Sequence, residues 1–372
     1  MVPVLPVDGS SVPALITALR PHLSGEQAPT VVPLGPGDGI ADLRPDLPVE
    51  PDTALIVRTS GSTGAAKGVL LSAAALRASG EATHRRLGGP GTWLLAMPAH
   101  HIAGVQVVVR SLLAGTPLTV MPRSGFRGRV FVEAASDVLS ADGPRYTALV
   151  PTQLGRLLTE GGDALAALRS FDAVLIGGAA TNPTMLTRVL EAGVRAVTTY
   201  GMSETAGGCV YNGTPLDGVK VRLVDNVIHL SGPTLSHGYR LNPKTDAFHN
   251  GWFHTSDLGT LTNGTLKILG RTDDVINTGG EKVTPTTVEQ ALTTHPAVLE
   301  ACVVGIPDPE WGQQVAAAIV TNGPVDLTEL KAAVRQALGP HATPKQIKIV
   351  PHLPLRGPGK IDRTTIINLL QN

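Results

Sequence analysis

Short apolar runs alternate with longer amphipathic stretches between residues 53 and 200. Runs of four to six residues rich in Val, Ile, Leu and Ala are typical of buried strands, whereas apolar residues three or four positions apart indicate helices. The predicted strands are 54–58, 93–97, 118–121, 146–150, 173–176 and 196–200, and the predicted helices are 72–86, 105–113, 153–160 and 183–192. This alternation favours an α/β architecture with a largely parallel sheet.

The two ends of the chain have a different texture. Residues 1–50 carry nine prolines and one predicted helix, 11–22, and we expect a packed arm rather than an independent domain. After Gly213, closely spaced short strands at 219–224, 227–231 and 266–269 predict a small β-rich subdomain. Beyond Arg271, the helices and strands predict an α+β unit, with helices 286–294 and 327–338 and strands 298–306 and 315–320.

The prediction is therefore an α/β protein of two domains. Residues 1–270 form a large N-terminal domain of layered α/β sheets with the β-rich subdomain, and residues 271–372 form a small mobile α+β domain. A chain of 372 residues is long enough for two such cores.

Charge and composition exclude several partners. The 30 basic and 30 acidic residues give a formal net charge of zero, so no field of one sign attracts nucleic acid or an anionic membrane. The longest apolar stretch, 93–113, is interrupted by Pro98 and Arg110, and we expect neither a membrane span nor a secretory leader. With only two cysteines, Cys209 and Cys302, a reducing cytoplasm is the simplest expectation.

The first string with distinctive chemistry covers residues 57–68. Its glycines let the backbone approach a ligand closely, its hydroxyls add donors and Lys67 supplies a cation, which together suit a phosphate-binding loop. It is not a Walker P-loop, because Ala66 and Gly68 flank the lysine, and this speaks against a kinase or GTPase of that class. A flexible linker between two elements is the alternative at this point.

Three further strings contain isolated acids in polar or glycine-rich surroundings. Residues 200–205 present Glu204, whose carboxylate suits the Mg²⁺ that accompanies nucleotide phosphates. Residues 252–259 present Asp257, which can accept hydrogen bonds from two ribose hydroxyls. Residues 270–283 lie at the predicted domain boundary. Each string alone could be a solvated turn.

In this order, the strings resemble the adenylate-forming superfamily of acyl-CoA synthetases, luciferases and nonribosomal peptide adenylation domains. The resemblance runs from Ile56 to Arg363, and residues 353–363 are similar to the family's terminal catalytic-lysine motif. Residues 150–158 and 201–219 look like the short actinobacterial form of the o-succinylbenzoate:CoA ligases of menaquinone biosynthesis.

The resemblance implies a two-step reaction and a set of roles. A carboxylate attacks the α-phosphorus of ATP to give an acyl-adenylate and pyrophosphate, and the thiol of coenzyme A then takes the acyl group. Lys360 would bridge the carboxylate and the α-phosphate, Glu204 would hold Mg²⁺, and His101 would lie beside the acyl and pantetheine pockets. The implied ATP-binding residues are Thr59, Ser60, Gly61, Ser62, Thr63, Gly64, Lys67, Gly177, Gly178, Ala179, Tyr200, Gly201, Met202, Ser203, Asp257 and Arg271.

Two more features follow from the resemblance. Asp273 occupies the hinge about which the small domain turns between the half-reactions, and Gly279, Gly280 and Glu281 would line the channel for coenzyme A. The chain departs from the family in length, since 58 residues precede the phosphate loop where members commonly have well over a hundred, and this puts one wall of the acyl pocket in doubt.

A substrate with a second carboxylate needs a cationic partner for it, because an unpaired buried carboxylate is costly. The candidates are Arg58, Arg110, Arg156 and Arg222, and the sequence does not rank them. The adjacent His100 and His101 are not expected to bind a metal, because on a strand they would face opposite sides and no third ligand is spaced nearby.

Alternatives to this function remain open. The same chemistry could activate another aryl or fatty acid, or load a carrier protein. A different class of function is that of a catalytically idle homologue that only binds nucleotide or a partner. The sequence also leaves open whether the chain forms a homo-oligomer. Retention of Lys67, Glu204, Asp257, Arg271 and Lys360 argues against the idle homologue.

Overall fold

The computed structural model describes residues 1–59, 67–122, 125–242, 245–355 and 360–371. The fold is α/β with several sheets, as predicted. Two compact units divide the chain: the first contains Met1–Gly178, Val189–Val221 and His229–His254, and the second contains Ala179–Arg188, Arg222–Ile228 and Thr255–Asn372. The division into domains 1–270 and 271–372 stays a prediction. The second compact unit also contains segments before residue 271.

A five-stranded sheet with the order β1-β2-β3-β4-β14 opens the first unit. Its strands are β1 (Val4–Asp8), β2 (Thr30–Leu34), β3 (Thr53–Thr59), β4 (Lys67–Ser72) and β14 (Gly238–Tyr239). The first three strands run parallel, whereas β4 and β14 are antiparallel to their neighbours. Because β4 follows residues 60–66, these residues connect two antiparallel strands, and the predicted helix 72–86 follows as α2 only after β4.

The first fifty residues are more integrated than a packed arm. They supply β1, β2, the short 3₁₀ helix η1 (Ala41–Leu43) and helix α1 (Val12–Leu23), which starts after Ser11 as predicted. Leu15 and Leu19 of α1 are fully buried, as the spacing of apolar residues on one helix face requires. Arg240 fixes the following segment, since its guanidinium donates to backbone carbonyls between Leu43 and Pro48.

A seven-stranded sheet with the order β11-β10-β9-β8-β7-β5-β6 forms the centre of the first unit. Its strands are β5 (Thr92–Leu95), β6 (Leu118–Val120), β7 (Arg145–Leu149), β8 (Ala173–Ile176), β9 (Ala196–Met202), β10 (Gly207–Tyr211) and β11 (Thr214–Pro215). Strands β5 to β9 are parallel, and β10 and β11 continue the sheet antiparallel. The predicted parallel sheet is confirmed.

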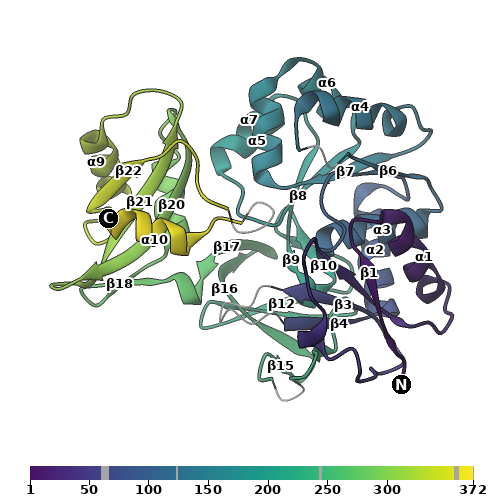
Figure 1. Ribbon diagram of the computed structural model, residues 1–372. Helices are drawn as coiled ribbons and strands as arrows, with labels where there is room; N and C mark the ends of the chain where they lie inside the picture. Colours follow the sequence, from purple (N-terminus) through teal and green to yellow (C-terminus); the bar gives the residue numbers. More distant parts are fainter. Residues whose placement is uncertain (60–66, 123–124, 243–244, 356–359, 372) are drawn as a thin grey trace. The chain divides into compact units, whose positions relative to one another are not determined.

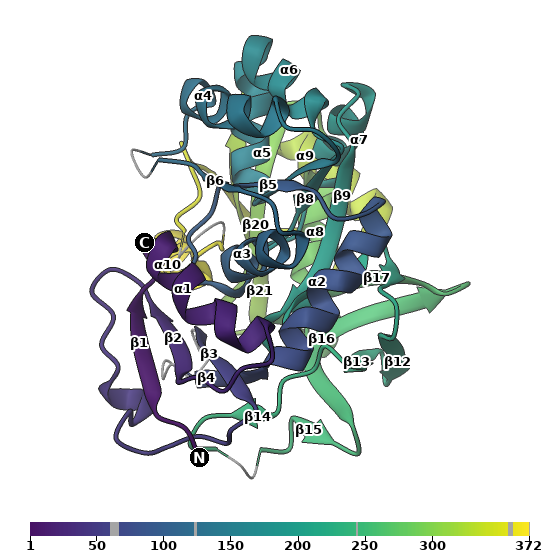
Figure 2. The ribbon, with the colours of Figure 1, turned by 90° about the vertical axis from the view of Figure 1, so that its right-hand side faces the viewer.

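Helices lie on both faces of this sheet (Figure 2). The helices between residues 73 and 191 are α2 (Ala73–Leu87), α3 (Ile102–Ala114), α4 (Gly128–Leu139), α5 (Pro151–Glu160), α6 (Gly162–Ser170) and α7 (Pro183–Glu191). Apolar side chains of α1, α2 and α3 form one core with both sheets, and α4 to α6 lie on the other side of the seven-stranded sheet (Figure 2). Helices α4 and α6 were not among the predicted elements.

The β-rich region after Gly213 is confirmed as a sheet with the order β12-β13-β16-β15, to which β17 adds by pairing with β16. The strands are β12 (Lys220–Val224), β13 (Val227–Ser231), β15 (Phe248–His249), β16 (Trp252–Thr262) and β17 (Thr265–Arg271). The turns at Asp225-Asn226 and Asn263-Gly264 have positive φ at both residues, which is the pattern of the tight hairpins that match strand twist.

The C-terminal part of the second unit is a sheet with the order β19-β18-β21-β20, with β22 parallel to β21. Its elements are η3 (Thr272–Asp274), β18 (Ile276–Thr278), β19 (Glu281–Val283), α8 (Pro285–Leu292), β20 (Val298–Asp308), β21 (Gly312–Thr321), α9 (Leu327–Leu338), β22 (Gln346–Ile349) and α10 (Arg363–Gln371). Side chains of β20 alternate between one core with α8 and α9 and another with α10. Figure 1 shows these helices beside the sheet. Both predicted helices and both predicted strands of this region are confirmed.

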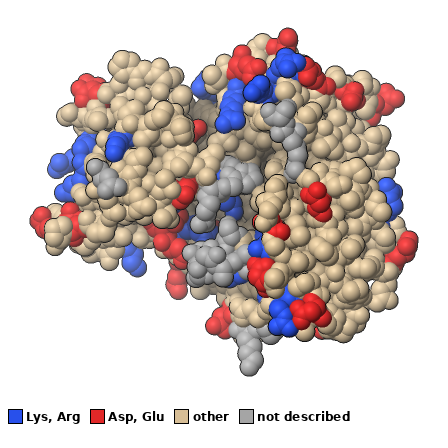
Figure 3. All heavy atoms as spheres, viewed as in Figure 1, with Lys and Arg blue, Asp and Glu red and all other residues tan. Residues whose placement is uncertain are grey.

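Charged side chains of both signs are interspersed on the face shown in Figure 3. This distribution agrees with the equal numbers of basic and acidic residues in the sequence. Among the helices that the structure describes, none combines the length and the apolar content that crossing a membrane requires.

Candidate functional site

The carboxyl ends of the parallel strands bring together four segments that the sequence analysis singled out. Residues 97–101 follow β5, residues 150–153 follow β7, Gly177 and Gly178 follow β8, and residues 200–204 end β9 or follow it. Gln153 connects its segment to the residue just before 97–101, because its side-chain amide donates to the carbonyl of Ala96 at 2.8 Å while its oxygen accepts from the backbone of Val150 at 3.0 Å. Ligands of open α/β sheets bind at this edge.

Gly177 stands where a side chain has no space. A Cβ there would lie 2.3 Å from Oγ1 of Thr199 on the neighbouring strand, whose hydroxyl donates to the carbonyl of Ile176 at 3.1 Å. Gly178 follows with φ of +81°, a conformation that glycine adopts without strain. Ala179, predicted with these two glycines, belongs to the second compact unit.

The turn after Tyr200 is closed tightly on itself. Gly201 lies so close to β10 that a Cβ would come within 2.1 Å of the carbonyl oxygen of Gly207. The hydroxyl of Thr205 accepts from the backbone of Met202 at 3.0 Å, and residues 203–205 form the 3₁₀ turn η2 (Ser203–Thr205). This turn presents the half-buried carboxylate of Glu204 at the carboxyl end of β9.

Tyr239 connects two of the predicted ATP-binding residues. Its hydroxyl donates to Oε1 of Glu204 at 2.9 Å, and the Nζ of Lys67 lies 4.9 Å from the centre of its ring. Burial and the neighbouring carboxylate raise the pKa of Tyr239, so the phenol stays protonated and remains the donor. The side chain is 7% exposed and packs edge-on against Phe248.

The structure describes only the two ends of the predicted phosphate loop. Thr59 ends β3 and pairs with Lys67 at the start of β4, so the two ends of the loop are fixed next to each other. Lys67 is exposed. The predicted ligands between them lie outside the described residues: Ser60, Gly61, Ser62, Thr63 and Gly64.

The two adjacent histidines are arranged differently from the expectation. They lie in the turn before α3 rather than on a strand, and His101 is the residue that precedes the first turn of that helix. Their rings are 4.2 Å apart, so they adjoin instead of facing opposite sides. Gly104 permits this turn, because a Cβ there would lie 2.2 Å from the carbonyl oxygen of Pro98.

The chemistry of Glu204 fits Mg²⁺ bound together with a nucleotide. Its Oε1 accepts from Tyr239, and Oε2 accepts no hydrogen bond from the residues that the structure describes. Clusters of three or more potential protein ligands for a metal are absent from the described parts of the chain. Mg²⁺ needs only one or two protein carboxylates when phosphates and water supply its other ligands.

In the second unit, Asp257 and Arg271 face each other on paired strands. Arg271 donates to Oδ1 of Asp257 at 3.3 Å and to Oδ2 of Asp273 at 3.1 Å. Burial opposes the charge of Arg271, but the two carboxylates raise its pKa above the ordinary value, so the guanidinium stays charged. Asp257 is 9% exposed, and its Oδ1 faces the guanidinium of Arg271.

The predicted channel residues form a hairpin turn. Gly279 and Gly280 have φ of +60° and +85° between β18 and β19, a conformation that glycine adopts without strain. Gly279 also packs against Trp311, since a Cβ would lie 2.4 Å from the indole ring. Glu281 begins β19 and is exposed.

Lys360 is exposed and lies between β22 and α10 of the second unit. Leu355 and Ile361 form an antiparallel bridge, and the backbone of Asp362 donates to the carbonyl of Pro354 at 2.8 Å. Residues 356–359 lie outside the described part of the chain.

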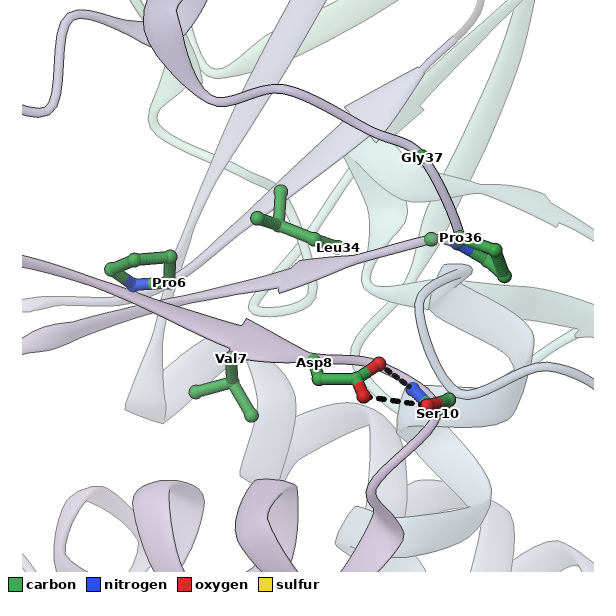
Figure 4. A pocket seen from close by; sticks show the side chains of 8 residues that line it. Pro6, Val7, Asp8, Ser10, Leu34, Pro36 and Gly37 are labelled. Carbon is green, nitrogen blue, oxygen red and sulfur yellow. Dashed lines mark hydrogen bonds between the residues drawn. The ribbon is translucent and has the colours of Figure 1, made fainter.

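A pocket of about 450 Å³ lies elsewhere, at the carboxyl ends of β1 and β2 (Figure 4). Asp8 points toward Ser10, which donates to the two oxygens of the carboxylate from its backbone and its hydroxyl. The remaining lining is mostly apolar, as Pro6, Val7 and Leu34 show. None of the predicted site residues lines this pocket.

Tyr239 is the functional candidate that sequence reasoning missed. It lies in no motif, and its contacts join positions far apart in the chain, so no local pattern pointed to it. The local sequence also does not show that the side chain of Tyr239 is buried.

Comparison with known proteins shows the family of the chain. Residues 10–239 match the family described as AMP-binding enzyme, and residues 287–360 match the AMP-binding enzyme C-terminal domain. The chain belongs to the AMP-binding enzyme family. It is 46% identical to a probable 2-succinylbenzoate–CoA ligase of Mycobacterium tuberculosis over 96% of both chains.

Two solved structures have the same fold. The amide bond synthetase of Marinactinospora thermotolerans is 27% identical, with a TM-score of 0.78, over 93% of this chain and 76% of that one. The O-succinylbenzoate coenzyme A synthetase of Bacillus subtilis in complex with AMP is 26% identical, with a TM-score of 0.73, over 88% of this chain and 71% of that one.

Proposed function

We propose that the chain is an AMP-forming acid-thiol ligase. It activates o-succinylbenzoate with ATP as an acyl-adenylate and transfers the acyl group to coenzyme A, giving o-succinylbenzoyl-CoA, AMP and pyrophosphate in menaquinone biosynthesis. The observation that carries the proposal is the 46% identity to a probable 2-succinylbenzoate–CoA ligase over 96% of both chains. The predicted segments at the carboxyl edge of the parallel strands give it a physical basis.

The roles of the residues are part of the proposal. Lys67 and the loop before it position the ATP phosphates, Tyr200 stacks on the adenine and Asp257 accepts the ribose hydroxyls. Lys360 stabilises the charge that develops on the non-bridging oxygens as the carboxylate attacks the α-phosphorus. Mg²⁺, held by Glu204, would neutralise part of the phosphate charge.

Transfer to coenzyme A needs a different arrangement of the small domain. We propose that the chain turns at Asp273, that Lys360 then leaves, and that the hairpin of Gly279, Gly280 and Glu281 lines the path of the thiol. Such a gate protects the acyl-adenylate from water, which would hydrolyse it. His101 would lie beside the acyl group.

Arg156 is our candidate for the second carboxylate of the substrate. Arg58 already pairs with Asp42 at 2.6 Å, and Arg110 is buried over the ring of Trp93. Arg156 instead lies exposed on α5, which starts at the carboxyl end of β7, and it has no hydrogen bond or ion pair with the described residues. Arg222 belongs to the second unit.

The test is ATP- and Mg²⁺-dependent pyrophosphate release with a panel of acids. We expect strong selectivity for o-succinylbenzoate over benzoate, salicylate, acetate and a long fatty acid, and turnover to the thioester when coenzyme A is present. Arg156→Gln should raise the KM for o-succinylbenzoate and leave that for benzoate unchanged. Release with another acid would retain the chemistry but replace the substrate, and release with none, in a folded protein that binds ATP, would support an idle homologue.

We also propose a cytoplasmic location. Cys209 and Cys302 are both free and buried, which fits a reducing compartment.

A further inference from the structure

Arg363 begins α10, three positions after Lys360. Between them, Ile361 forms a bridge with Leu355, and the backbone of Asp362 donates to the carbonyl of Pro354. Lys360 is therefore the residue that directly precedes this backbone pairing. Whatever fixes Arg363 therefore fixes the base of the segment that carries Lys360.

Oxygen atoms from three elements of the second unit hold the guanidinium of Arg363, and its Nη1 also lies 3.6 Å from Sγ of Cys302. Its Nη2 lies 3.0 Å from Oε1 of Glu289 on α8, its Nε lies 3.4 Å from Oδ2 of Asp274 in η3, and its Nη1 donates to the carbonyl of Val303 on β20 at 2.6 Å. The side chains are largely buried, with 28% of Arg363 and 13% of Glu289 exposed.

The charges depend on one another. Burial opposes the charge of Arg363, but Glu289 and its neighbours raise the pKa of the guanidinium above its ordinary value. Burial likewise raises the pKa of Glu289, against the opposite influence of Arg363. Removing either partner leaves a poorly solvated charge, so breaking this contact destabilises the fold more than breaking an exposed ion pair.

Asp273 and Asp274 are consecutive but contact different arginines. Asp273 accepts from Arg271 at 3.1 Å, whereas Asp274 pairs with Arg363. The short turn that contains the proposed hinge is thus attached on one side to Arg271, opposite Asp257, and on the other side to the base of the Lys360 segment.

We propose that Arg363 is a positioning residue that makes the Lys360 segment and the hinge turn η3 move as one body. The inference rests on the proposed function, in which Lys360 stabilises the adenylation transition state and the chain turns at Asp273. Rigid attachment has a chemical purpose, since displacing a catalytic group by about 1 Å can cost about a hundredfold in rate. When the hinge turns, the same attachment carries the lysine away.

The experiment compares Arg363 variants in two backgrounds. Arg363→Lys keeps the charge but cannot reach Asp274, Glu289 and Val303 with one planar fork. It should lower o-succinylbenzoate-dependent pyrophosphate release about tenfold, which corresponds to about 1.4 kcal/mol. In a Lys360→Ala background the same change should alter the residual rate by less than about twofold, because residues that act through one another are not additive.

The second half-reaction supplies another readout. Thioester formation from coenzyme A and purified acyl-adenylate should change less than pyrophosphate release in Arg363→Lys. Asp274→Asn removes one charged partner, leaves the Glu289 contact in place and should give a smaller effect of the same pattern. Arg335→Gln, at an exposed position of α9, is the matched control and should leave both half-reactions unchanged.

The outcomes separate the inference from the function on which it rests. If Arg363→Lys and Asp274→Asn slow pyrophosphate release equally with and without Lys360, Arg363 supports only the fold and the inference is wrong. If Lys360→Ala alone releases pyrophosphate at the normal rate, the proposed role of the lysine is wrong, and the inference falls with it. A thermal unfolding midpoint measured for each variant shows which of them are folded.

Discussion

Replacing Tyr239 by Phe tests how the carboxylate of Glu204 is oriented. The change removes one hydroxyl that donates to Oε1 of Glu204 at 2.9 Å. It keeps the ring that faces Lys67 and packs against Phe248. The expected loss therefore concerns the carboxylate and what it binds, whereas the environment of the lysine is preserved.

The magnitude follows from the charge and burial of the pair. A hydrogen bond to a charged group contributes about 1.5–3 kcal/mol, and water can replace part of it here because Glu204 is only half-buried. The lower end, about 1.5 kcal/mol, corresponds to about a tenfold change. This agrees with the effect of about 10–100-fold on metal affinity when a group that orients a metal ligand is lost.

The assay is the Mg²⁺ dependence of ATP binding by calorimetry, together with that of pyrophosphate release. Tyr239→Phe should raise the Mg²⁺ concentration for half-saturation about tenfold and change binding of ATP without Mg²⁺ by less than about twofold. Tyr239→Leu also removes the ring beneath Lys67 and should weaken ATP binding with and without the metal.

Tyr211→Phe is the matched control. Its hydroxyl is also buried, where it lies 2.9 Å from Oγ1 of Thr83 and accepts from Arg110 at 3.3 Å. Its loss should lower stability without changing the Mg²⁺ dependence. An unchanged Mg²⁺ dependence in Tyr239→Phe, or the same change in both variants, would refute the idea that Tyr239 orients a metal-binding carboxylate.

Three further predictions concern stability and the half-reactions. Gly201→Ala places a Cβ 2.1 Å from the carbonyl of Gly207 and should cost about 1–3 kcal/mol in urea unfolding as well as most adenylation, whereas Gly323→Ala, with open space around it, should do neither. Burial lowers the pKa of His84 from 6.5 to about 4, so its contribution to stability is present above pH 6.5 and is lost as the pH falls toward 4, by at most about 3 kcal/mol; His84→Gln should flatten this part of the pH profile, and an unchanged slope would contradict the assignment. Asp273→Pro restricts φ at the proposed hinge and should slow thioester formation more than adenylate formation, and equal losses would count against a hinge.

The elements that the sequence predicted well are those with a strong local pattern. Strand β8 is buried along its whole length and reads as a continuous apolar run. Helix α9 shows apolar residues on one face and ends before a glycine, and its bounds agree with the prediction. In both cases the local sequence contains the information that sets the element.

The missed strands have weak local signals. Pro6 argues against a strand, yet β1 is the edge of its sheet, where proline is tolerated because one side of the strand has no partner. Strand β4 was hidden by the polar loop before it, and its pairing with β3 across that loop defines it. Position within a sheet decides both cases, and position is not a local property.

For the candidate site too, the sequence predicted the parts with a local motif and missed the residues that only long-range contacts define. The motif order predicted which segments carry chemistry, because each contains a distinctive combination of glycines, hydroxyls and charges. Tyr239 and Arg363 became candidates only through their contacts, with Lys67 and Glu204 in one case and with Asp274 and Glu289 in the other. These partners are distant in the sequence, so no spacing rule connects them.

The late strand β14 has a consequence for biosynthesis. Gly238 and Tyr239 pair with Leu70 and Val69. During synthesis, the edge of β4 therefore stays unpaired until most of the chain has left the ribosome. Until then, an unpaired strand edge of apolar residues is open to association with other chains. The nascent protein should therefore depend on chaperones over this interval, and a chain that stops before Gly238 should aggregate even though β1 to β4 are complete.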